Sequence, residues 1–228
     1  MAGQEPLIEA VVFDVGETLV DETRAWEGWA DHLAVPRLTF LGVLGAAIER
    51  GEDHLAPFRV FAPGLDLRAA ATARAAAGEV VDVSMEDLYP DALDALRALR
   101  AAGIRLAVAG NQPASTEALF RALDIDLELV ASSATLGASK PDPAFFAAIA
   151  AHLALPPSAI AYVGDRIDND VRPAAASGMR AIFIRRGPWA WIGAGASDPP
   201  EAAAVIDSLL ELPAVLARLG DAGQAPRA

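Results

Sequence analysis

The sequence predicts an α/β fold, in which a doubly wound parallel sheet carries an inserted all-helical cap. From about residue 88 onward, short apolar runs alternate with helical patterns, which is typical of such a sheet. A strand-like apolar run comes first, at residues 8–13. Residues 21–87 follow it and show helical spacing with no strand-like run of their own. We therefore expect residues 1–20 and 88–228 to form the core and residues 21–87 to form the cap.

The first strand is predicted over residues 8–13, where an apolar run ends abruptly at Asp14. Gly16 and Thr18 follow it at intervals of two residues. A parallel strand that is buried on both faces delivers the next residues into the crevice beyond its carboxyl end. Asp14 is therefore the candidate nucleophile.

Three helices are expected in the inserted segment. The first is indicated by apolar residues at helical spacing before Pro36, and the third runs from Asp66, a possible N-cap, to Gly78. The first two helices would present the stripes Trp26, Trp29, Leu33 and Leu38, Leu41, Leu44, Ile48.

The remaining elements follow in alternation. A helix begins at Pro90 and Asp91, and another begins after Asp142 as N-cap with Pro143 at the first helical position. Residues 187–200 are predicted to form a packed loop that carries Trp189 and Trp191. Aromatic residues in such loops are more often structural anchors, and a place at the mouth of the site is the alternative. Strands are expected over 104–109, 127–131, 159–163 and 180–184, with a final short strand and helix within 205–219.

Composition narrows the classes of function. The 228 residues carry a formal charge of −13, which would repel nucleic acid and anionic membranes. Cysteine is absent, so disulfides and thiolate chemistry are excluded. No signal-like segment and no apolar run of about 18 residues occurs. We expect a cytoplasmic protein, monomeric or homodimeric, with a small-molecule substrate and no nucleic-acid or membrane partner.

Polar residues follow several of the predicted strands, so they should converge on Asp14. The acids among them would repel one another by roughly 4 kcal/mol per pair at about 4 Å and an effective dielectric near 20. A cation must offset this repulsion, and a site rich in oxygen suits Mg²⁺, which also clamps phosphate oxygens. The converging residues are Asn111, Lys140, Asp165 and Asp170.

Three segments, taken together, resemble the haloacid dehalogenase-like (HAD) hydrolase superfamily, and its helical-cap (C1-type) subfamily in particular. They are residues 13–19 around Asp14, the run Lys140-Pro-Asp-Pro143, and Gly164-Asp165 with Asp170. The resemblance covers nearly the whole chain and implies a Rossmann-like core.

The resemblance also implies a set of roles. Asp14 would attack phosphorus to give an aspartyl-phosphate, and Lys140, the only lysine in the chain, would neutralise nucleophile and phosphate. Mg²⁺ would be bound by Asp14, the backbone carbonyl of Gly16, Asp165 and Asp170. The phosphate would contact Thr18, Gly110, Asn111 and Lys140.

Two positions depart from the pattern of the family's phosphatases. Gly16 stands where they usually carry a second Asp as general acid, and Gly110 stands where they carry Ser or Thr. A positioned acid is commonly worth about 10² to 10⁴ in rate, so its loss should slow a phosphatase without abolishing it. Glu17 could replace the acid, although its position should point it elsewhere. On this basis Gly16→Asp should raise phosphatase activity.

Two alternatives stay open. One is a catalytically weak or inactive relative that binds a ligand or a protein. The other is a 2-haloacid dehalogenase, whose nucleophile attacks carbon without a metal. Such enzymes typically lose the Gly-Asp metal ligand, which this chain keeps as Asp165.

Overall fold

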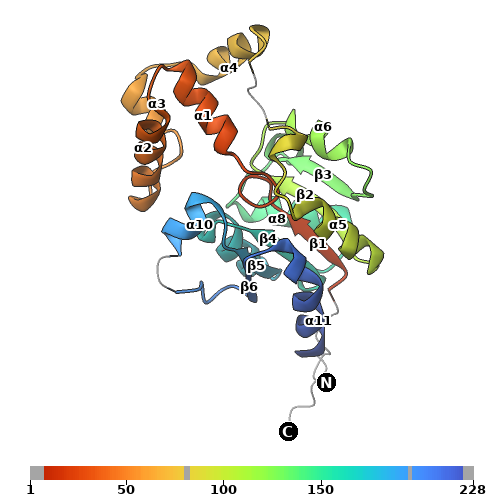
Figure 1. The fold of residues 1–228 in the computed structure, drawn as a ribbon. Coiled ribbons are helices and arrows are strands. Elements are labelled where there is room, and N and C mark those ends of the chain that lie inside the picture. Colours follow the sequence, from red (N-terminus) through yellow and green to blue (C-terminus); the bar gives the residue numbers. More distant parts are fainter. Residues whose placement is uncertain (1–7, 80–82, 195–196, 223–228) are drawn as a thin grey trace.

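A computed structural model describes residues 8–79, 83–194 and 197–222, and it confirms the predicted fold class. Its sheet has six parallel strands in the order β3-β2-β1-β4-β5-β6 (Figure 1). The order reverses on the two sides of β1, and such a switch point is where ligands bind in open α/β sheets. The strands are β1 (Ala10–Phe13), β2 (Arg105–Gly110), β3 (Leu129–Ser132), β4 (Ile160–Gly164), β5 (Arg180–Ile184) and β6 (Ala204–Ile206).

The central strand β1 is buried along its whole length. Because successive side chains of a strand point to opposite faces, Val11 and Phe13 join one hydrophobic cluster while Ala10 and Val12 join another. This double burial explains why the run reads as continuously apolar. It also fixes the position of Asp14, the first residue beyond the strand.

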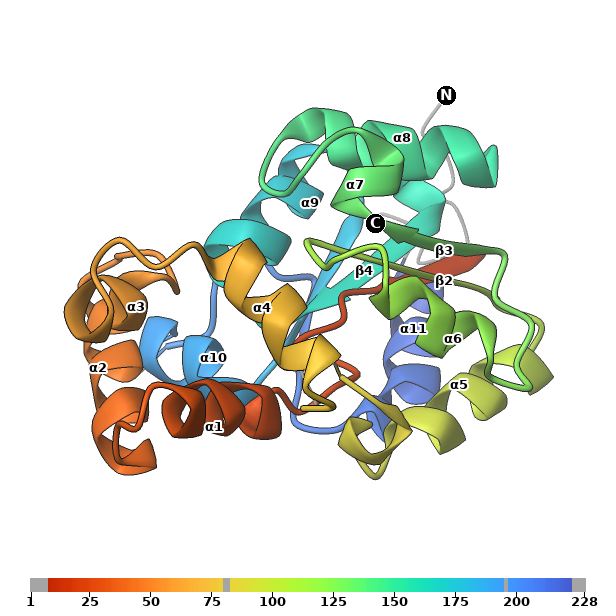
Figure 2. The same ribbon diagram turned by 90° about the horizontal axis from the view of Figure 1, so that it is seen from above.

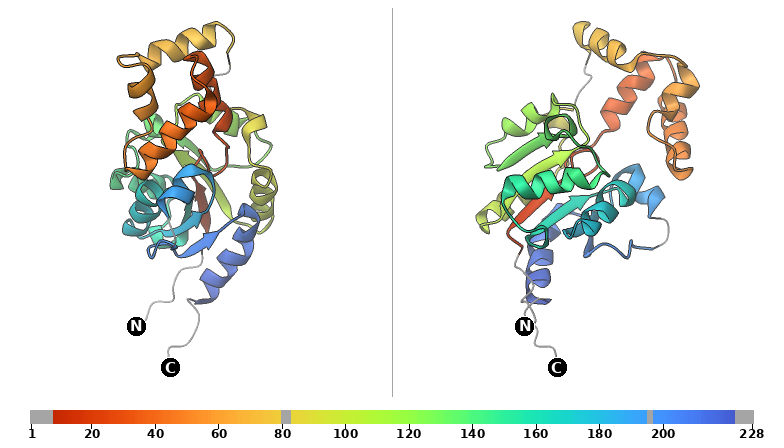
Figure 3. Two further views of the ribbon diagram at one scale, coloured as in Figure 1. Left: turned by 60° about the vertical axis from the view of Figure 1, so that its left-hand side comes forward. Right: turned by 180° about the vertical axis from the view of Figure 1, so that it is seen from behind.

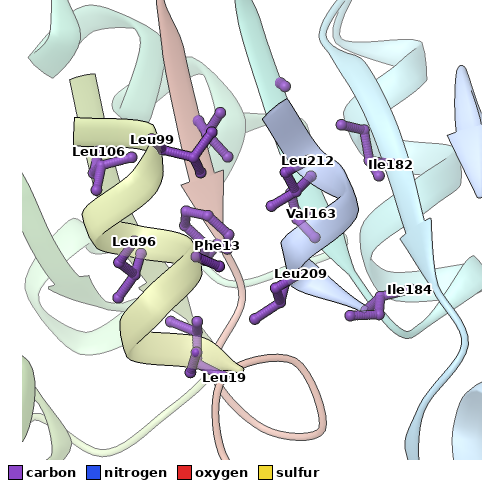
Figure 4. Packing of buried hydrophobic residues seen from close by; sticks show 14 of the residues in the cluster. Phe13, Leu19, Leu96, Leu99, Leu106, Val163, Ile182, Ile184, Leu209 and Leu212 are labelled. Atoms are coloured by element: carbon purple, nitrogen blue, oxygen red, sulfur yellow. The ribbon is translucent and has the colours of Figure 1, made fainter. Parts of the chain in front are cut away.

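Helices cover both faces of the sheet. On one face, Leu96 and Leu99 of α5 pack with Phe13, and Leu212 lies in the same cluster (Figure 4). Full burial of such a side chain stabilises the fold by about 1.5–3 kcal/mol. The helices of this face are α5 (Ala92–Ala101), α6 (Thr116–Arg121) and α11 (Leu212–Ala222), and those of the other are α8 (Pro143–Leu153) and α9 (Arg172–Ala176).

The first four helices of the described chain follow β1 directly. They lie together beyond the carboxyl ends of the strands, as Figures 1 and 3 show. The third of them was not predicted, because one short turn leaves little periodic signal. Asp66 caps the fourth, as predicted, by accepting a hydrogen bond from the amide of Ala69 at 3.0 Å. The helices are α1 (Thr23–His32), α2 (Arg37–Glu49), α3 (Ala56–Phe61) and α4 (Leu67–Ala76). The exact limits of the cap, 21 and 87, stay a prediction.

The buried face of α2 differs from the predicted stripe. The structure buries Phe40, Leu44 and Ala47, whereas Leu38 is 85% exposed. Phe40 packs on the rings of Phe58 and Phe61 in α3, so the partner helix selects the face. Apolar residues occur all around α2, and spacing alone could not choose between them.

The segment predicted as a loop after residue 187 contains the helix α10 (Gly187–Gly193). Pro188 occupies its first turn, where a missing N–H costs nothing. The helix contacts α2, beside which it lies in Figure 2. Further short turns are η1 (Met85–Asp87), α7 (Ser133–Leu136), η2 (Pro157–Ala159), η3 (Ile167–Val171) and η4 (Leu209–Glu211).

Within residues 8–79, 83–194 and 197–222, no single helix has the length and apolarity needed to cross a membrane. The pair α1 and α2 reaches that length and apolarity only together, and it is bent by 118°.

Candidate active site

Three buried carboxyl groups meet at the carboxyl end of the central strands. Asp14 follows β1, Asp165 follows β4, and Asp170 lies in the turn η3. They offer carboxylate oxygens that all lie within 4.8 Å of one another. Sequence reasoning predicted this convergence, and the parallel alignment of β1 with β4 produces it.

Two glycines at strand ends make room for these acids. A Cβ on Gly110 would lie 2.5 Å from Oδ1 of Asp14, and one on Gly164 would lie 2.5 Å from Cβ of Asp170. Such distances are shorter than nonbonded atoms tolerate. The Ser or Thr expected from the family at position 110 is therefore incompatible with the placement of Asp14 seen here.

Lys140 neutralises part of the cluster. Its Nζ lies 2.6 Å from Oδ1 of Asp14 and 2.6 Å from Oδ1 of Asp170. Burial by itself would lower the pKa of Lys140, but the charges of Asp14 and Asp170 raise it well above its usual value. The ammonium group therefore stays charged beside the nucleophile.

Asn111 binds the backbone of Lys140 at both ends of its amide. Its Nδ2 donates to the carbonyl oxygen of Lys140 at 2.9 Å, and its Oδ1 accepts from the amide of Lys140 at 2.9 Å. This contact joins the end of β2 to the segment before α8. Asn111 also lines the cavity described below. The structure thus gives it a positioning role, and its predicted contact with phosphate stays a prediction.

The charge of the cluster is not fully balanced by Lys140. Burial, followed by the charges of Asp170 and Asp14, raises the pKa of Asp165 well above its usual value. Burial also raises the pKa of Asp170 to about 6, with Lys140 opposing it. Oδ2 of Asp165 accepts no hydrogen bond from the described residues. An oxygen-only donor set with an unpaired buried oxygen fits a hard divalent cation.

A cavity of about 730 Å³ opens above these residues. Asp14, Lys140 and Asp165 lie among its lining residues, and aromatic side chains from the cap and from α10 supply much of the rest. The ring centroids of Trp26 and Trp189 lie 6.4 Å apart, so the cap and α10 meet across the cavity wall. The aromatic residues of the lining are Trp26, Trp29, Phe58 and Trp189. For Trp189, a structural anchor in a loop was the favoured expectation and a place at the mouth of the site the alternative, and the structure places it in the cavity lining.

Glu17 is held by hydrogen bonds from two directions. The hydroxyl of Tyr89 donates to its Oε2 at 2.6 Å, and the amide of Glu22 donates to its Oε1 at 3.1 Å. Its backbone has φ = 53°, which is unusual for a residue with a side chain. Both carboxylate oxygens of Glu17 are therefore engaged in hydrogen bonds that hold the loop after β1. The structure does not favour Glu17 as the missing acid.

Glu22, the residue before α1, was not singled out from the sequence. It lines the cavity together with Gly16 and accepts a hydrogen bond from Nε2 of Gln112 at 3.3 Å. Burial, followed by the charge of Glu17, raises the pKa of Glu22 to about 7. No motif marks this position, because it comes near the site only through the way α1 starts above the loop.

The structure does not bring every predicted residue to the cavity. Thr18 is fully buried and is not among the lining residues, while its carbonyl oxygen accepts from Arg186 at 3.0 Å. Gly16 does line the cavity. The metal contact of the Gly16 carbonyl and the phosphate contacts of Thr18 and Gly110 stay predictions.

The family model for haloacid dehalogenase-like hydrolases matches residues 8–178. This span contains the three acids, Lys140 and the cap. The chain therefore belongs to the haloacid dehalogenase-like hydrolases.

Relatives of known name include phosphatases. The chain is 36% identical over 104 residues to a glyceraldehyde 3-phosphate phosphatase from Methanopyrus kandleri, a match that covers 44% of this chain and 45% of the relative. The chain thus spans less than half the length of that relative. A phosphatase from Mycobacterium tuberculosis is 29% identical over 188 residues, which is 75% of each protein.

Solved structures of the same fold include a 2-haloacid dehalogenase from Pseudomonas syringae pv. tomato. It is 26% identical and superposes with a TM-score of 0.60 over 92% of this chain and 99% of its own. The family therefore includes both reaction types considered from the sequence, and the site must distinguish them.

Proposed function

We propose that this chain is a Mg²⁺-dependent phosphatase of the helical-cap (C1-type) subfamily, acting on a small phosphorylated metabolite through an aspartyl-phosphate on Asp14. The observation that carries the proposal is the contact of Lys140 with both Asp14 and Asp170, beside an Asp165 oxygen that accepts no hydrogen bond from the part of the chain that the structure describes. A nucleophile, a fixed cation and a vacant oxygen ligand are thereby adjacent. This is the arrangement that phosphoryl transfer requires, since positioning and charge supply most of its catalysis.

Asp14 is the attacking group. Its carboxylate, oriented by the contact with Lys140, forms the bond to phosphorus, and the bond to the leaving oxygen breaks. Water then displaces phosphate from Asp14. Lys140 offsets negative charge on the transferred group throughout. Asp14, Asp165 and Asp170 would hold Mg²⁺, which would act as a Lewis acid on a phosphoryl oxygen.

The cavity wall supports a substrate that carries an apolar part. Trp26, Trp29, Phe58 and Trp189 line it, whereas Lys140 and Arg166 are the only Lys or Arg residues among the described residues that do. Arg166 is already engaged with Asp168 at 2.7 Å and lies over the ring of Trp189 at 5.6 Å. Monophosphates with a compact or apolar leaving group suit this wall better than substrates with several anionic groups.

Dehalogenation is the second candidate, favoured by the similarity to a 2-haloacid dehalogenase and by the absence of an acid at position 16. Against it stand Asp165 and Asp170, because a reaction at carbon without a metal has no use for a cluster of buried acids. A relative that binds without catalysis is the third candidate, motivated by Gly16 and Gly110.

Turnover of phosphate monoesters, acyl phosphates and 2-haloacids, with and without Mg²⁺, tests the proposal. We expect phosphate release that needs Mg²⁺ and is abolished in Asp14→Asn. Asp168→Asn is the matched control, because Asp168 lies near the cluster in sequence, has a side chain that is 66% exposed and pairs with Arg166. Halide release without metal would support the dehalogenase, and no release of either product would support the binding protein.

A further inference from the structure

The space in which a side chain at position 16 would stand is filled by Glu22. A Cβ built on Gly16 would contact Oε1 of Glu22, would lie 2.7 Å from its Cδ, and would lie 3.1 Å from Nε2 of Gln112. The carboxyl group of Glu22 and a side chain at position 16 therefore exclude each other. Gly16 therefore does not leave this place without a carboxyl group, since Glu22 brings one to it.

We propose, on the basis of the proposed phosphatase function, that Glu22 supplies the general acid that Gly16 lacks. In the first step the Glu22 carboxyl gives its proton to the leaving oxygen as the bond from that oxygen to phosphorus breaks. In the second step the Glu22 carboxylate takes a proton from the water that attacks phosphorus, while the bond from phosphorus to Asp14 breaks. Ester and water thus become alcohol and phosphate, and Glu22 is restored.

Three features of the surroundings fit this role. Glu22 lines the same cavity as Asp14, Lys140 and Asp165, so a bound ester can reach it. Gln112 donates to Oε1 of Glu22 at 3.3 Å and so helps to orient the carboxyl group. The amide of Glu22 is fixed by Glu17, which the Tyr89 hydroxyl anchors in turn. The backbone that carries the acid is therefore attached to the loop that carries the nucleophile.

With Glu22 as the acid, a different effect of Gly16→Asp on phosphatase activity is expected. From the sequence, this substitution should restore the family's acid and raise activity. In the structure, the new side chain has to displace Glu22, so the single variant exchanges one acid for another. A gain is expected only where Glu22 has been shortened, as in the double variant Gly16→Asp with Glu22→Ala.

The test compares two phosphate esters in the presence of Mg²⁺: 4-nitrophenyl phosphate, whose leaving group needs little protonation, and glycerol 2-phosphate, whose alkoxide needs it. Glu22→Gln keeps the shape of the side chain and can still accept from Gln112. We expect it to lower kcat on the alkyl ester by about 10² to 10⁴, the usual value of a positioned acid, and on the aryl ester by less than about tenfold. Glu27→Gln, in the helix α1 that follows Glu22 but outside the cavity lining, should lower neither.

The double variant supplies the second measurement. Relative to Glu22→Ala, we expect Gly16→Asp with Glu22→Ala to regain at least about tenfold in turnover of the alkyl ester, a part of what a positioned acid contributes. Equal losses on both esters in Glu22→Gln, no loss, or no recovery in the double variant would overturn the role of Glu22 while leaving the phosphatase standing. A wild-type protein that hydrolyses neither ester would instead overturn the proposed function itself.

Discussion

The amide side chain of Asn111 forms two hydrogen bonds with the backbone of Lys140, each of 2.9 Å. The pair joins the end of β2 to the residue that holds the candidate nucleophile, although 29 positions separate the two in the sequence. The position of the Lys140 ammonium thus depends on a side chain that need not touch the substrate.

Replacing Asn111 with Ala should therefore impair both folding and catalysis. We expect unfolding to become easier by about 1–3 kcal/mol, because a buried backbone donor and acceptor lose their partner. We also expect kcat to fall while the Mg²⁺ requirement persists. Asn169→Ala is the control, since Asn169 lines the same cavity without binding the backbone of Lys140. Urea unfolding and steady-state kinetics measure the two effects, and equal effects in both variants would argue against the positioning role.

Divalent metal should stabilise the protein through the acidic cluster. At a Mg²⁺ concentration a hundred times Kd, binding to the folded state alone adds about 2.7 kcal/mol to the free energy of unfolding. Asp165→Ala should remove this gain, because Asp165 supplies the buried oxygen that has no hydrogen-bond partner among the described residues. Thermal unfolding with and without Mg²⁺ measures it. Asp168→Asn should keep the gain, and a gain that survives in Asp165→Ala would contradict the proposed ligand set.

Gly110→Ser should harm the protein, even though the family's phosphatases usually carry Ser or Thr there. The new Cβ would lie 2.5 Å from Oδ1 of Asp14, and Asp14 cannot withdraw freely because Lys140 holds it. We expect overpacking to cost about 1–3 kcal/mol of stability and activity to fall as the nucleophile moves.

Gly42→Ser is the matched control for that substitution, because a Cβ at Gly42 would meet nothing within 4 Å. Phosphatase assays together with chemical unfolding compare the two variants. Improved turnover in Gly110→Ser would show that Asp14 has more freedom than its contacts indicate.

Acid should weaken the fold through Glu117. Burial would raise the pKa of Glu117, but hydrogen bonds from Ser132, Thr135 and Arg121 lower it to about 2. The unfolded chain, with an ordinary pKa near 4.5, then binds more protons than the folded one as pH falls. The contribution of Glu117 to the free energy of unfolding is therefore complete above about pH 5 and is lost progressively toward pH 2.

Glu117→Gln tests this dependence on pH. We expect it to cost about 1–3 kcal/mol of stability at neutral pH and to flatten the decline of the urea midpoint between pH 5 and pH 3. The exposed Glu49 offers the control, and Glu49→Gln should leave that decline in place. An unchanged slope in Glu117→Gln would mean that other groups govern acid unfolding.

The sequence by itself determined the sheet and the main groups of the site. An apolar run that ends in an acid fits a buried strand of a parallel sheet, and such strands end at the same edge. The strands before Asp14 and Asp165 therefore determined where those carboxyl groups meet. Chain order then placed Lys140 at the same edge. These inferences needed only local periodicity and the rule that parallel strands end on one side.

Only the tertiary structure decided which residue stands in the space beside Gly16 and why Gly110 has no side chain. Both answers depend on distances of a few ångströms between segments far apart in the sequence, such as α1 above the loop after β1. The same is true of Trp189, whose helix is held by its contact with the cap. Periodicity reports which face of an element is buried, but not which side chains share one volume, because close packing is a property of the assembled chain.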